Sequence, residues 1–327
     1  MADVYYSKSI SEGFLIRLKQ ELLKEFEGCK KIAVKMHFGE PGNRFAFVPE
    51  DIEPIIKILN DMDIDLFMYD SSVLYSSPRQ NPEGHMRVAI EKGFDKLGEI
   101  RTDDDFIEFQ GENLVYEVCK PLTEVDAVLI LTHFKGHMCC GFGGAIKNLG
   151  MGAVTNKSKK DIHEGAKPIF DGECDQCKTC ENACPFGAIK VEDYPEFEGC
   201  FGCSLCTEVC QKHSIKTVVA HFETLLADSA NCAQKNFKKY YYISFMKNIA
   251  QKCDCNGNSD KNFIIAKDSG ILCCKDAVAI DKAAHDIVVE NEGKDVFLKK
   301  NKKTGLKQVE EAERLGMGST EFNLVEV

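Results

Sequence analysis

Two runs of cysteine carry the clearest chemistry in this sequence. Both have the spacing C-x2-C-x2-C-x3-C, first in CDQCKTCENACP at 174–185 and again in CFGCSLCTEVCQ at 200–211. A cubane iron–sulfur cluster needs one thiolate on each of four irons, and three closely spaced cysteines let one loop reach three of them. Zinc prefers two well-separated C-x2-C pairs and fits three cysteines per loop poorly. The spacing therefore predicts two 4Fe–4S clusters.

The same runs occur in bacterial two-cluster ferredoxins, in which the fourth cysteine of each run ligates the other cluster. On that rule, the predicted ligands of cluster I are Cys174, Cys177, Cys180 and Cys210. The predicted ligands of cluster II are Cys200, Cys203, Cys206 and Cys184. Each cluster would then join the two halves of the segment. The second run lacks the proline that follows the first at Pro185, but a short apolar stretch still follows it, so the second site is retained.

A further set of metal-ligand residue types lies outside the two runs. His133 and His137 follow an apolar run, and Cys253 and Cys255 stand one residue apart. Histidine and cysteine together suit zinc or iron better than calcium or magnesium. Two cysteines so close are hard to explain as a disulfide, because the ring would be strained. A third metal site, for zinc or iron, is the hypothesis; the alternative is a set of buried thiols and hydrogen-bonded histidines.

The glycine-rich stretch GFGGAIKNLGMG at 141–152 suggests an anion site. Loops beyond the carboxyl ends of parallel strands bind ligands in α/β proteins. Free N–H groups at a helix start, together with Lys147 and Asn148, would suit a carboxylate or phosphate. Arg79, beside a turn, is another candidate anion contact. The stretch is neither a Walker loop nor a dinucleotide fingerprint, and a tight turn with packing glycines explains it equally well.

The elements that must position these residues alternate between strands and helices. Strands are predicted at 31–37, 64–70, 125–132, 240–246, 262–267 and 321–326. Helices are predicted at 11–26, 52–59, 83–93, 223–237, 276–289 and 306–315. The continuous apolar run at 125–132 is typical of a strand that is buried on both faces. The alternation favours an α/β fold, with a mostly parallel sheet and helices on both faces.

The cysteine runs interrupt this alternation. We therefore predict a discontinuous α/β domain, formed by residues 1–170 plus 217–327, with a small α+β ferredoxin-type domain inserted at 171–216. Three sequential domains are the alternative. That alternative is less favoured, because residues 217–327 alone have few helices to cover their strands.

Composition limits the setting and the partners of the chain. Its 327 residues are 44% apolar and 28% charged, as in ordinary globular proteins. No stretch approaches the 18 apolar residues of a membrane helix, and the N-terminus lacks the features of a signal peptide. Seventeen cysteines without an export signal indicate a reducing, cytoplasmic compartment and metal ligation. A net charge of −11 disfavours nucleic acid as the main partner.

The segments outside the cysteine runs resemble the family called domain of unknown function 362. The matching stretches are THFKGHMCCGFGGAIKNLGMG at 132–152, KCDC at 252–255, DSGILCCKDAVAIDKAAHDIV at 268–288 and LGMGSTEFNLVEV at the end of the chain. The resemblance covers nearly the whole chain. It implies an α/β iron–sulfur protein with an inserted two-cluster ferredoxin, and it implies no particular reaction.

Together these features predict a cytoplasmic iron–sulfur protein that transfers electrons to or from a site on the α/β domain, near 133–148 and 253–255. Its counterpart would be a redox partner protein or a small-molecule substrate. One alternative is an oxidoreductase that acts on a small anionic substrate at that site. The other is a metal-dependent or binding protein in which the clusters are structural.

Overall fold

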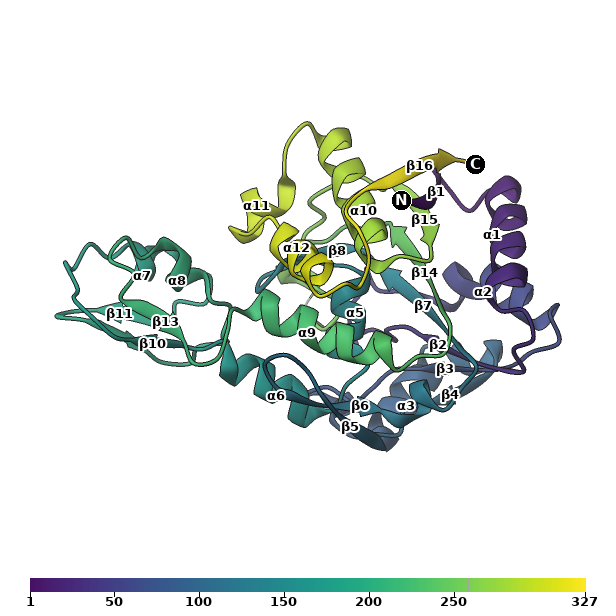
Figure 1. The fold of residues 1–327 in the computed structure, drawn as a ribbon, viewed down its shortest axis with the longest axis horizontal. Coiled ribbons are helices and arrows are strands. Elements are labelled where there is room, and N and C mark those ends of the chain that lie inside the picture. The colour runs from purple at the N-terminus through teal and green to yellow at the C-terminus, as the bar shows by residue number, and fades with distance from the viewer. Residues whose placement is uncertain (258) are drawn as a thin grey trace.

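A mostly parallel sheet forms the centre of the molecule in the computed structural model, which describes residues 1–257 and 259–327 (Figure 1). In this part of the chain the sheet has eight strands in the order β16-β1-β15-β14-β7-β2-β3-β4. They are β1 (Ala2–Ser7), β2 (Lys31–Lys35), β3 (Asp65–Tyr69), β4 (Glu99–Arg101), β7 (Ala127–His133), β14 (Tyr240–Met246), β15 (Gly270–Cys274) and β16 (Phe322–Glu326). Strand β15 runs antiparallel to both neighbours, and the other adjacent pairs are parallel. The predicted fold class is confirmed.

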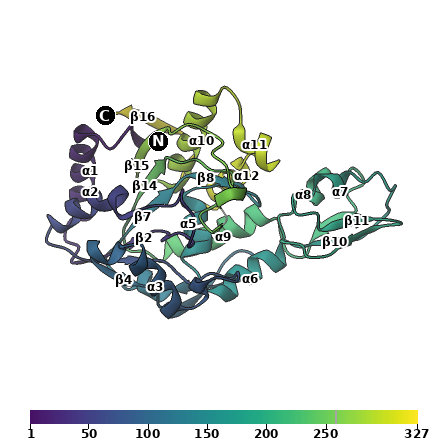
Figure 2. The same ribbon diagram turned by 180° about the vertical axis from the view of Figure 1, so that it is seen from behind.

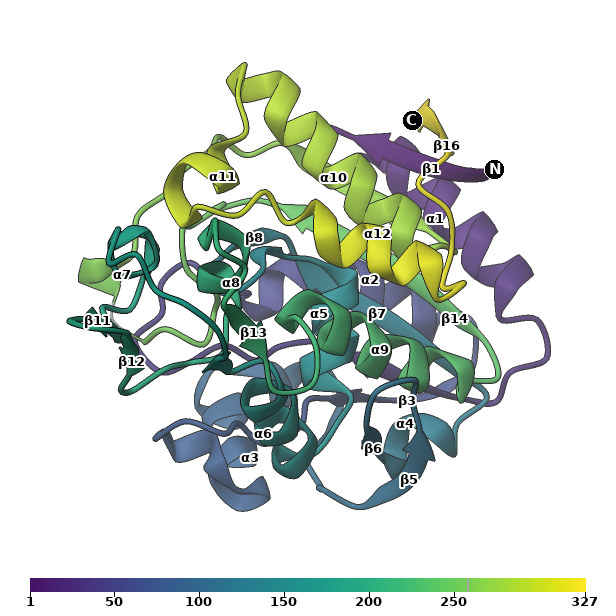
Figure 3. The ribbon, with the colours of Figure 1, turned by 60° about the vertical axis from the view of Figure 1, so that its left-hand side comes forward.

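Helices cover both faces of this sheet. They are α1 (Glu12–Glu25), α2 (Pro49–Asn60), α3 (Pro82–Glu91), α4 (Lys120–Thr123), α5 (Ala145–Gly152), α6 (Asn156–Gly165), α9 (Phe222–Lys235), α10 (Ala277–Glu292), α11 (Val296–Asn301) and α12 (Leu306–Arg314). Figure 3 shows α5, α9, α10 and α12 in front of the sheet and α1 and α2 behind it. Successive side chains of β7 enter opposite cores: Val128 and Ile130 pack with the front helices, and Leu129 and Leu131 with α1 and α2. Burial on both faces is why this strand is apolar from Ala127 to Leu131.

The edge of the sheet differs from the prediction. The strand predicted at 262–267 is wrong: among the described residues, this segment contributes an isolated bridge between Ala250 and Ile264. Phe263 and Ile264 are largely exposed, so their apolar character does not reflect a sheet position. The strand beside β14 is instead β15, and β1 then joins the two ends of the chain by pairing with both β15 and β16.

The cysteine-rich segment extends away from the sheet, at the left of Figure 1 and at the right of the reverse view in Figure 2. Its elements are β10 (Pro168–Phe170), α7 (Thr179–Ala183), β11 (Ile189–Val191), β12 (Pro195–Phe197), α8 (Leu205–Val209) and β13 (Ile215–Thr217). Strands β10 and β13 pair at its base. The strands that flank it in sequence, β7 and β14, lie side by side in the large sheet. This pairing agrees with an insertion, because one sheet then contains strands from before and after the cysteine-rich segment. The division of the chain into two domains stays a prediction.

Smaller elements complete the described chain. The hairpin strands are β5 (Phe106–Gln110), β6 (Val115–Cys119), β8 (Lys135–His137) and β9 (Gly141–Gly143), and the 3₁₀ turns span Pro78–Gln80, Phe94–Leu97 and Ser259–Lys261. Hairpin β8–β9 links β7 to α5 and thereby places the glycine-rich stretch at one end of the sheet. Within the described residues, no helix combines the length and apolar character needed to cross a bilayer.

A buried carboxylate joins two of the front helices. Asp281 of α10 accepts hydrogen bonds from the N–H groups of Ala145 (2.6 Å) and Ile146 (3.0 Å), in the first turn of α5. Its side chain is fully buried. Burial raises the pKa of Asp281 to about 7, although the two N–H donors oppose the shift. This carboxyl therefore titrates near neutral pH.

The raised pKa predicts a pH-dependent stability. Because the pKa is higher in the folded state, the contribution of Asp281 is complete below its unfolded value and is lost as the pH rises through about 7. Relative to Asp281→Asn, the wild type should lose about 2 kcal/mol of unfolding free energy between pH 5.5 and 8.5. Denaturation at both pH values measures the difference. Asp193→Asn, at an exposed position, is the control, and parallel curves for wild type and Asp281→Asn would contradict the prediction.

Candidate functional site

A cavity of about 160 Å³ lies at the carboxyl ends of three parallel strands. Lys35 ends β2, Asp70 follows β3, and α5 begins shortly after β7. Its polar lining includes Lys35, His37, Asp70, His137, Lys147, Asn148, Lys159 and His163. Open parallel sheets bind ligands at this edge, because strand ends and helix starts converge there. The cavity is therefore the candidate site on the α/β part of the chain.

Lys35 and Asp70 form a buried ion pair in the wall of the cavity. The Lys35 ammonium donates to Asp70 Oδ1 at 2.9 Å, to the Met36 carbonyl at 2.7 Å and to Asn148 Oδ1 at 3.1 Å. Burial alone would raise the pKa of Asp70, but Lys35 and His85 hold it well below its usual range. Asp70 therefore stays ionised and neutralises Lys35, and all three donors of this ammonium are engaged.

Arg79 lies close to Asp70 but does not line the cavity. Its fully buried guanidinium donates to Glu40 Oε2 from Nε at 3.0 Å, and its Nη1 lies 3.6 Å from Asp70 Oδ2. The Ser77 hydroxyl accepts from the Arg79 backbone N–H and caps the 3₁₀ turn that directs the side chain inward. The prediction of Arg79 as an anion contact is corrected, because its charge is already matched by buried carboxylates.

The two predicted anion contacts on α5 differ from each other. Asn148 accepts from Lys35 and donates to the Leu131 carbonyl (2.9 Å) and Thr132 Oγ1 (3.2 Å), so its amide holds α5 against β7. The ammonium of Lys147 has no hydrogen-bond or ion-pair partner among the described residues. Lys147 is half-buried and lines the cavity. Of these two residues, Lys147 is therefore the one with a charge available to a ligand.

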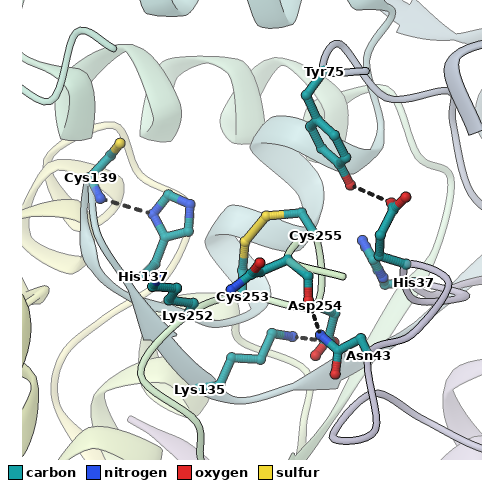
Figure 4. The surroundings of a disulfide bond; sticks show 12 residues. His37, Asn43, Tyr75, Lys135, His137, Cys139, Lys252, Cys253, Asp254 and Cys255 are labelled. Carbon is teal, nitrogen blue, oxygen red and sulfur yellow. Dashed lines mark hydrogen bonds and ion pairs between the residues drawn. A yellow bond between two sulfur atoms is a disulfide. The ribbon is translucent and has the colours of Figure 1, made fainter. Parts of the chain in front are cut away.

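Two histidines in the cavity wall are held in defined tautomers by their neighbours. The N–H of Cys139 donates to His137 Nδ1 at 3.3 Å, which leaves the proton on Nε2 (Figure 4). His163 Nδ1 donates to the carbonyl of Phe201 at 2.8 Å, which leaves Nε2 as an acceptor. Burial and the nearby Lys147 hold the pKa of His137 well below its usual range, and burial also lowers the pKa of His163. Both rings are neutral near pH 7.

The four residues of the predicted third metal site are engaged elsewhere. His133 lies 3.0 Å from Asp254 through Nδ1 and 2.7 Å from the Lys247 carbonyl through Nε2, so both ring nitrogens face oxygen acceptors. Cys253 and Cys255 form a disulfide, across a turn that brings their Cα atoms to 5.2 Å (Figure 4). In residues 1–257 and 259–327, no three His, Cys, Asp or Glu side chains converge on a single-ion position. The third-metal prediction, and the argument against a disulfide, are corrected.

The two segments of that prediction do meet, through a residue that was not predicted. Asp254, between the two cysteines, pairs with His133 and with Lys135 at 2.8 Å. Burial raises the pKa of Asp254, but these two side chains outweigh burial and hold it well below its usual range. Cys255 then forms part of the cavity wall together with His137 and His37. The loop at 253–255 thus contributes a disulfide, and not a metal ligand, to the site.

The eight cysteines of the two runs gather in two sets. A small hollow is lined by Cys174, Cys177, Cys180 and Cys210, the set predicted for cluster I. In the other set, burial raises the pKa of Cys206 to about 12, helped by the nearby thiols of Cys203, Cys200 and Cys184 and by that of Cys180 from the first set. Backbone N–H groups donate to the sulfurs of Cys174, Cys184 and Cys200 at 3.3–3.4 Å. Thiolates around a cubane stand farther apart than around one ion, because irons and sulfides separate them, and the donor set fits such a group.

The second cysteine run touches the wall of the cavity. The Phe222 ring lies 6.3 Å from the His137 ring and 5.2 Å from the His163 ring, centre to centre. The Phe222 N–H donates to Ser204 Oγ at 3.1 Å. Gly202 approaches α6 so closely that a Cβ there would lie 2.1 Å from the His163 carbonyl, and its φ of +67° also favours glycine. Side chains of the cavity therefore pack directly against the segment around Cys203.

Two lysines after α11 hold the cysteine-rich segment to the rest of the chain. Lys302 donates to the carbonyls of Asn182 (3.0 Å) and Ala183 (3.1 Å). The buried ammonium of Lys303 donates to the Cys203 carbonyl at 2.6 Å and pairs with Glu223 of α9. These contacts reach both cysteine runs. Together with the Phe222 contact, they fix the segment beside the cavity.

Several cavity residues were missed in the sequence. Three of them belong to the predicted strands. Lys35 lies near the end of 31–37, His37 is its last residue, and Asp70 is the last residue of 64–70. The rule that ligand sites form at carboxyl strand ends applies to these strands as much as to 125–132. Lys159 belongs to a polar stretch of the sequence that gives no sign of a site. In the structure it lies on α6, and its ammonium donates to Ser71 Oγ at 2.8 Å. The signal that could have identified Lys35, His37 and Asp70 is a polar residue within or just after an apolar strand.

Comparison with known proteins gives a match to a family, a similar curated protein and two solved structures. Residues 32–286 match the family described as "Domain of unknown function (DUF362)". Over 75 residues, the chain is 33% identical to "Pyruvate synthase subunit PorD" of Methanothermobacter marburgensis, a match that covers 23% of this chain and 89% of that subunit. This similarity and the 17 cysteines support an iron–sulfur, electron-transfer role in general terms.

Two solved structures overlap partly with the fold. A structural-genomics protein from Thermotoga maritima has a TM-score of 0.45 at 11% identity, covering 73% of this chain and 52% of its own. The lactate racemase apoprotein from Thermoanaerobacterium thermosaccharolyticum has a TM-score of 0.39 at 12% identity, covering 75% and 50%. The chain thus spans about half the length of each of these two structures.

Proposed function

We propose that this chain, which belongs to the family described as domain of unknown function (DUF362), holds two 4Fe–4S clusters in residues 171–216 and exchanges electrons with a ligand in the cavity of the α/β part. The cluster ligands would be the two sets of four cysteines described above. Support for the first half comes from the cysteine spacing, from the N–H groups that donate to sulfur, and from the similarity to PorD.

The contact between the second cysteine run and the cavity carries this proposal. Phe222 packs on His137 and His163, and its N–H binds Ser204, the neighbour of Cys203. Cys139 and Cys203 belong to the same buried cluster of side chains. When bound, the clusters would supply electrons one at a time. This packing places the second cysteine set next to the cavity wall, as electron exchange between the two would require.

The residues of the cavity would bind and orient the electron acceptor or donor. Lys147 offers an ammonium that has no partner in the described part of the chain, and His137 offers an N–H at Nε2. The apolar wall formed by Met151 and Phe222 would exclude water from one side of the ligand. These features favour the redox enzyme acting on a small anion over a carrier that merely hands electrons to another protein.

A test of the proposal compares two redox states of the same protein. Anaerobically purified protein should contain about eight irons and eight sulfides per chain, as two cubane clusters require. Hydrogen–deuterium exchange of peptides from 133–148 should then differ between oxidised protein and protein reduced with dithionite, while peptides from α1 should not. Identical exchange at 133–148 in both states would contradict the proposed coupling between the clusters and the cavity. Zinc without acid-labile sulfide would remove the clusters themselves.

A further inference from the structure

We infer that the cavity between β2, β3, α5 and α6 binds a small organic dianion, whose carboxylate or phosphate groups are recognised by Lys147 and Lys159. The inference deepens the proposed function, on which it rests for the redox role of the bound molecule. The binding itself can be measured without any electron transfer.

The charges that line the cavity leave two ammonium groups without an acidic partner. Asp70 neutralises the charge of Lys35, and the Lys35 ammonium also donates a hydrogen bond to Asn148. Lys159 donates to two neutral oxygens, Ser71 Oγ and the Ser72 carbonyl. Within the described residues, neither Lys147 nor Lys159 lies in an ion pair. The cavity therefore carries an excess of two positive charges.

Burial makes these two charges costly in the absence of a ligand. Burial lowers the pKa of Lys159 to about 8, although nearby acidic groups partly oppose it, and burial also lowers the pKa of Lys147. A buried charge without a counter-ion is retained in a folded protein when something else offsets its desolvation. A dianionic ligand would supply both missing partners at once.

A neutral donor in the wall adds direction to this charge. His137 carries its proton on Nε2, because its Nδ1 accepts from Cys139. His37 accepts from the Gly39 N–H at 2.8 Å through Nδ1, and its Nε2 lies 3.5 Å from Nη1 of Arg79, so this ring nitrogen faces a guanidinium. Burial holds the pKa of His37 well below its usual range, and Arg79 lowers it further. The neutral N–H of His137 thus belongs to a cavity wall that also contains two lysine ammonium groups, and all three groups donate.

The remaining wall is apolar, which argues for an organic anion. Val73, Leu74, Met151 and Phe222 line the same cavity. A free inorganic ion would gain nothing from these side chains, whereas a short carbon chain would bury apolar surface against them. A volume of about 160 Å³ limits the ligand to a small molecule. Short dicarboxylates and small phosphate esters share this chemistry.

Titration calorimetry on anaerobically purified, iron-replete protein tests the inference. The probes are succinate, glycerol 3-phosphate, inorganic phosphate, and succinamide as the uncharged counterpart of succinate. At least one organic dianion should bind more tightly than inorganic phosphate, and succinamide should not bind. Lys147→Met should weaken the binding by about 10-fold or more, since a hydrogen bond to a charged group is lost. Lys147→Arg, which keeps the charge, should retain it within about threefold.

Lys160→Met is the matched control, because this exposed lysine is next to Lys159 on α6 and outside the cavity. It should bind as the wild type does. Absence of binding by both organic dianions at about 10 mM, or equal affinity in wild type and Lys147→Met, overturns the inference. If inorganic phosphate binds more tightly than both organic dianions, the inference that the ligand is organic is overturned. The iron content and the redox-dependent exchange of 133–148 test the proposed function separately, so each can fail without the other.

Discussion

Replacing Cys210 with serine is expected to remove about half of the iron from anaerobically purified protein. Cys210 lies in the second cysteine run, yet in the structure it lines a hollow with Cys174, Cys177 and Cys180 of the first run. A cubane that loses one of four thiolates is released or degraded, whereas the other set keeps its ligands. Iron and acid-labile sulfide analysis measures the loss.

Two further variants separate this result from general damage. Cys206→Ser should also remove about half of the iron, but from the other set, so the paramagnetic resonance spectra of the two reduced variants should differ. Cys232→Ser is the control, because this buried cysteine of α9 lies outside both runs and donates weakly to the Phe109 carbonyl. It should keep its full iron content. Identical spectra for Cys210→Ser and Cys206→Ser would refute the crossed assignment of ligands.

Replacing Arg79 with methionine is expected to lower the free energy of unfolding by roughly 3–5 kcal/mol. The guanidinium is fully buried and binds Glu40 at 2.8 Å, with Asp70 at 3.6 Å. Methionine fills part of the space but leaves Glu40 as a buried carboxylate without its main partner. Breaking a buried pair from one side costs more than the pair itself contributes, since the remaining charge stays desolvated.

Chemical denaturation of iron-replete protein checks this value. Arg87→Met, at an exposed position on α3, should change the stability by no more than about 0.5 kcal/mol. The double variant Arg79→Met/Glu40→Gln should recover part of the loss, because it also removes the unpaired charge. A loss below about 1 kcal/mol in Arg79→Met, or no recovery in the double variant, would show that the pair is not the reason for the buried arginine.

The sequence by itself determined the features that depend on local spacing and periodicity. The cysteine runs could be recognised because cluster ligation imposes a fixed interval on neighbouring residues. The central strand β7 could be recognised because burial on both faces requires apolar side chains at every position. Amphipathic helices such as α1 and α2 followed from their apolar stripes in the same way. All of these signals lie within a few residues of one another in the chain.

Only the tertiary structure decided which polar residues share the site. Lys35, Asp70 and Lys159 come from three separate elements, and nothing in their local spacing relates them. Arg79 and Lys147 look alike in the sequence, yet Arg79 is matched by buried carboxylates, whereas Lys147 lines the cavity without a partner among residues 1–257 and 259–327. The availability of a charge depends on which groups the fold places within about 4 Å of it. That distance is set by the packing of strands and helices, which no short stretch of sequence contains.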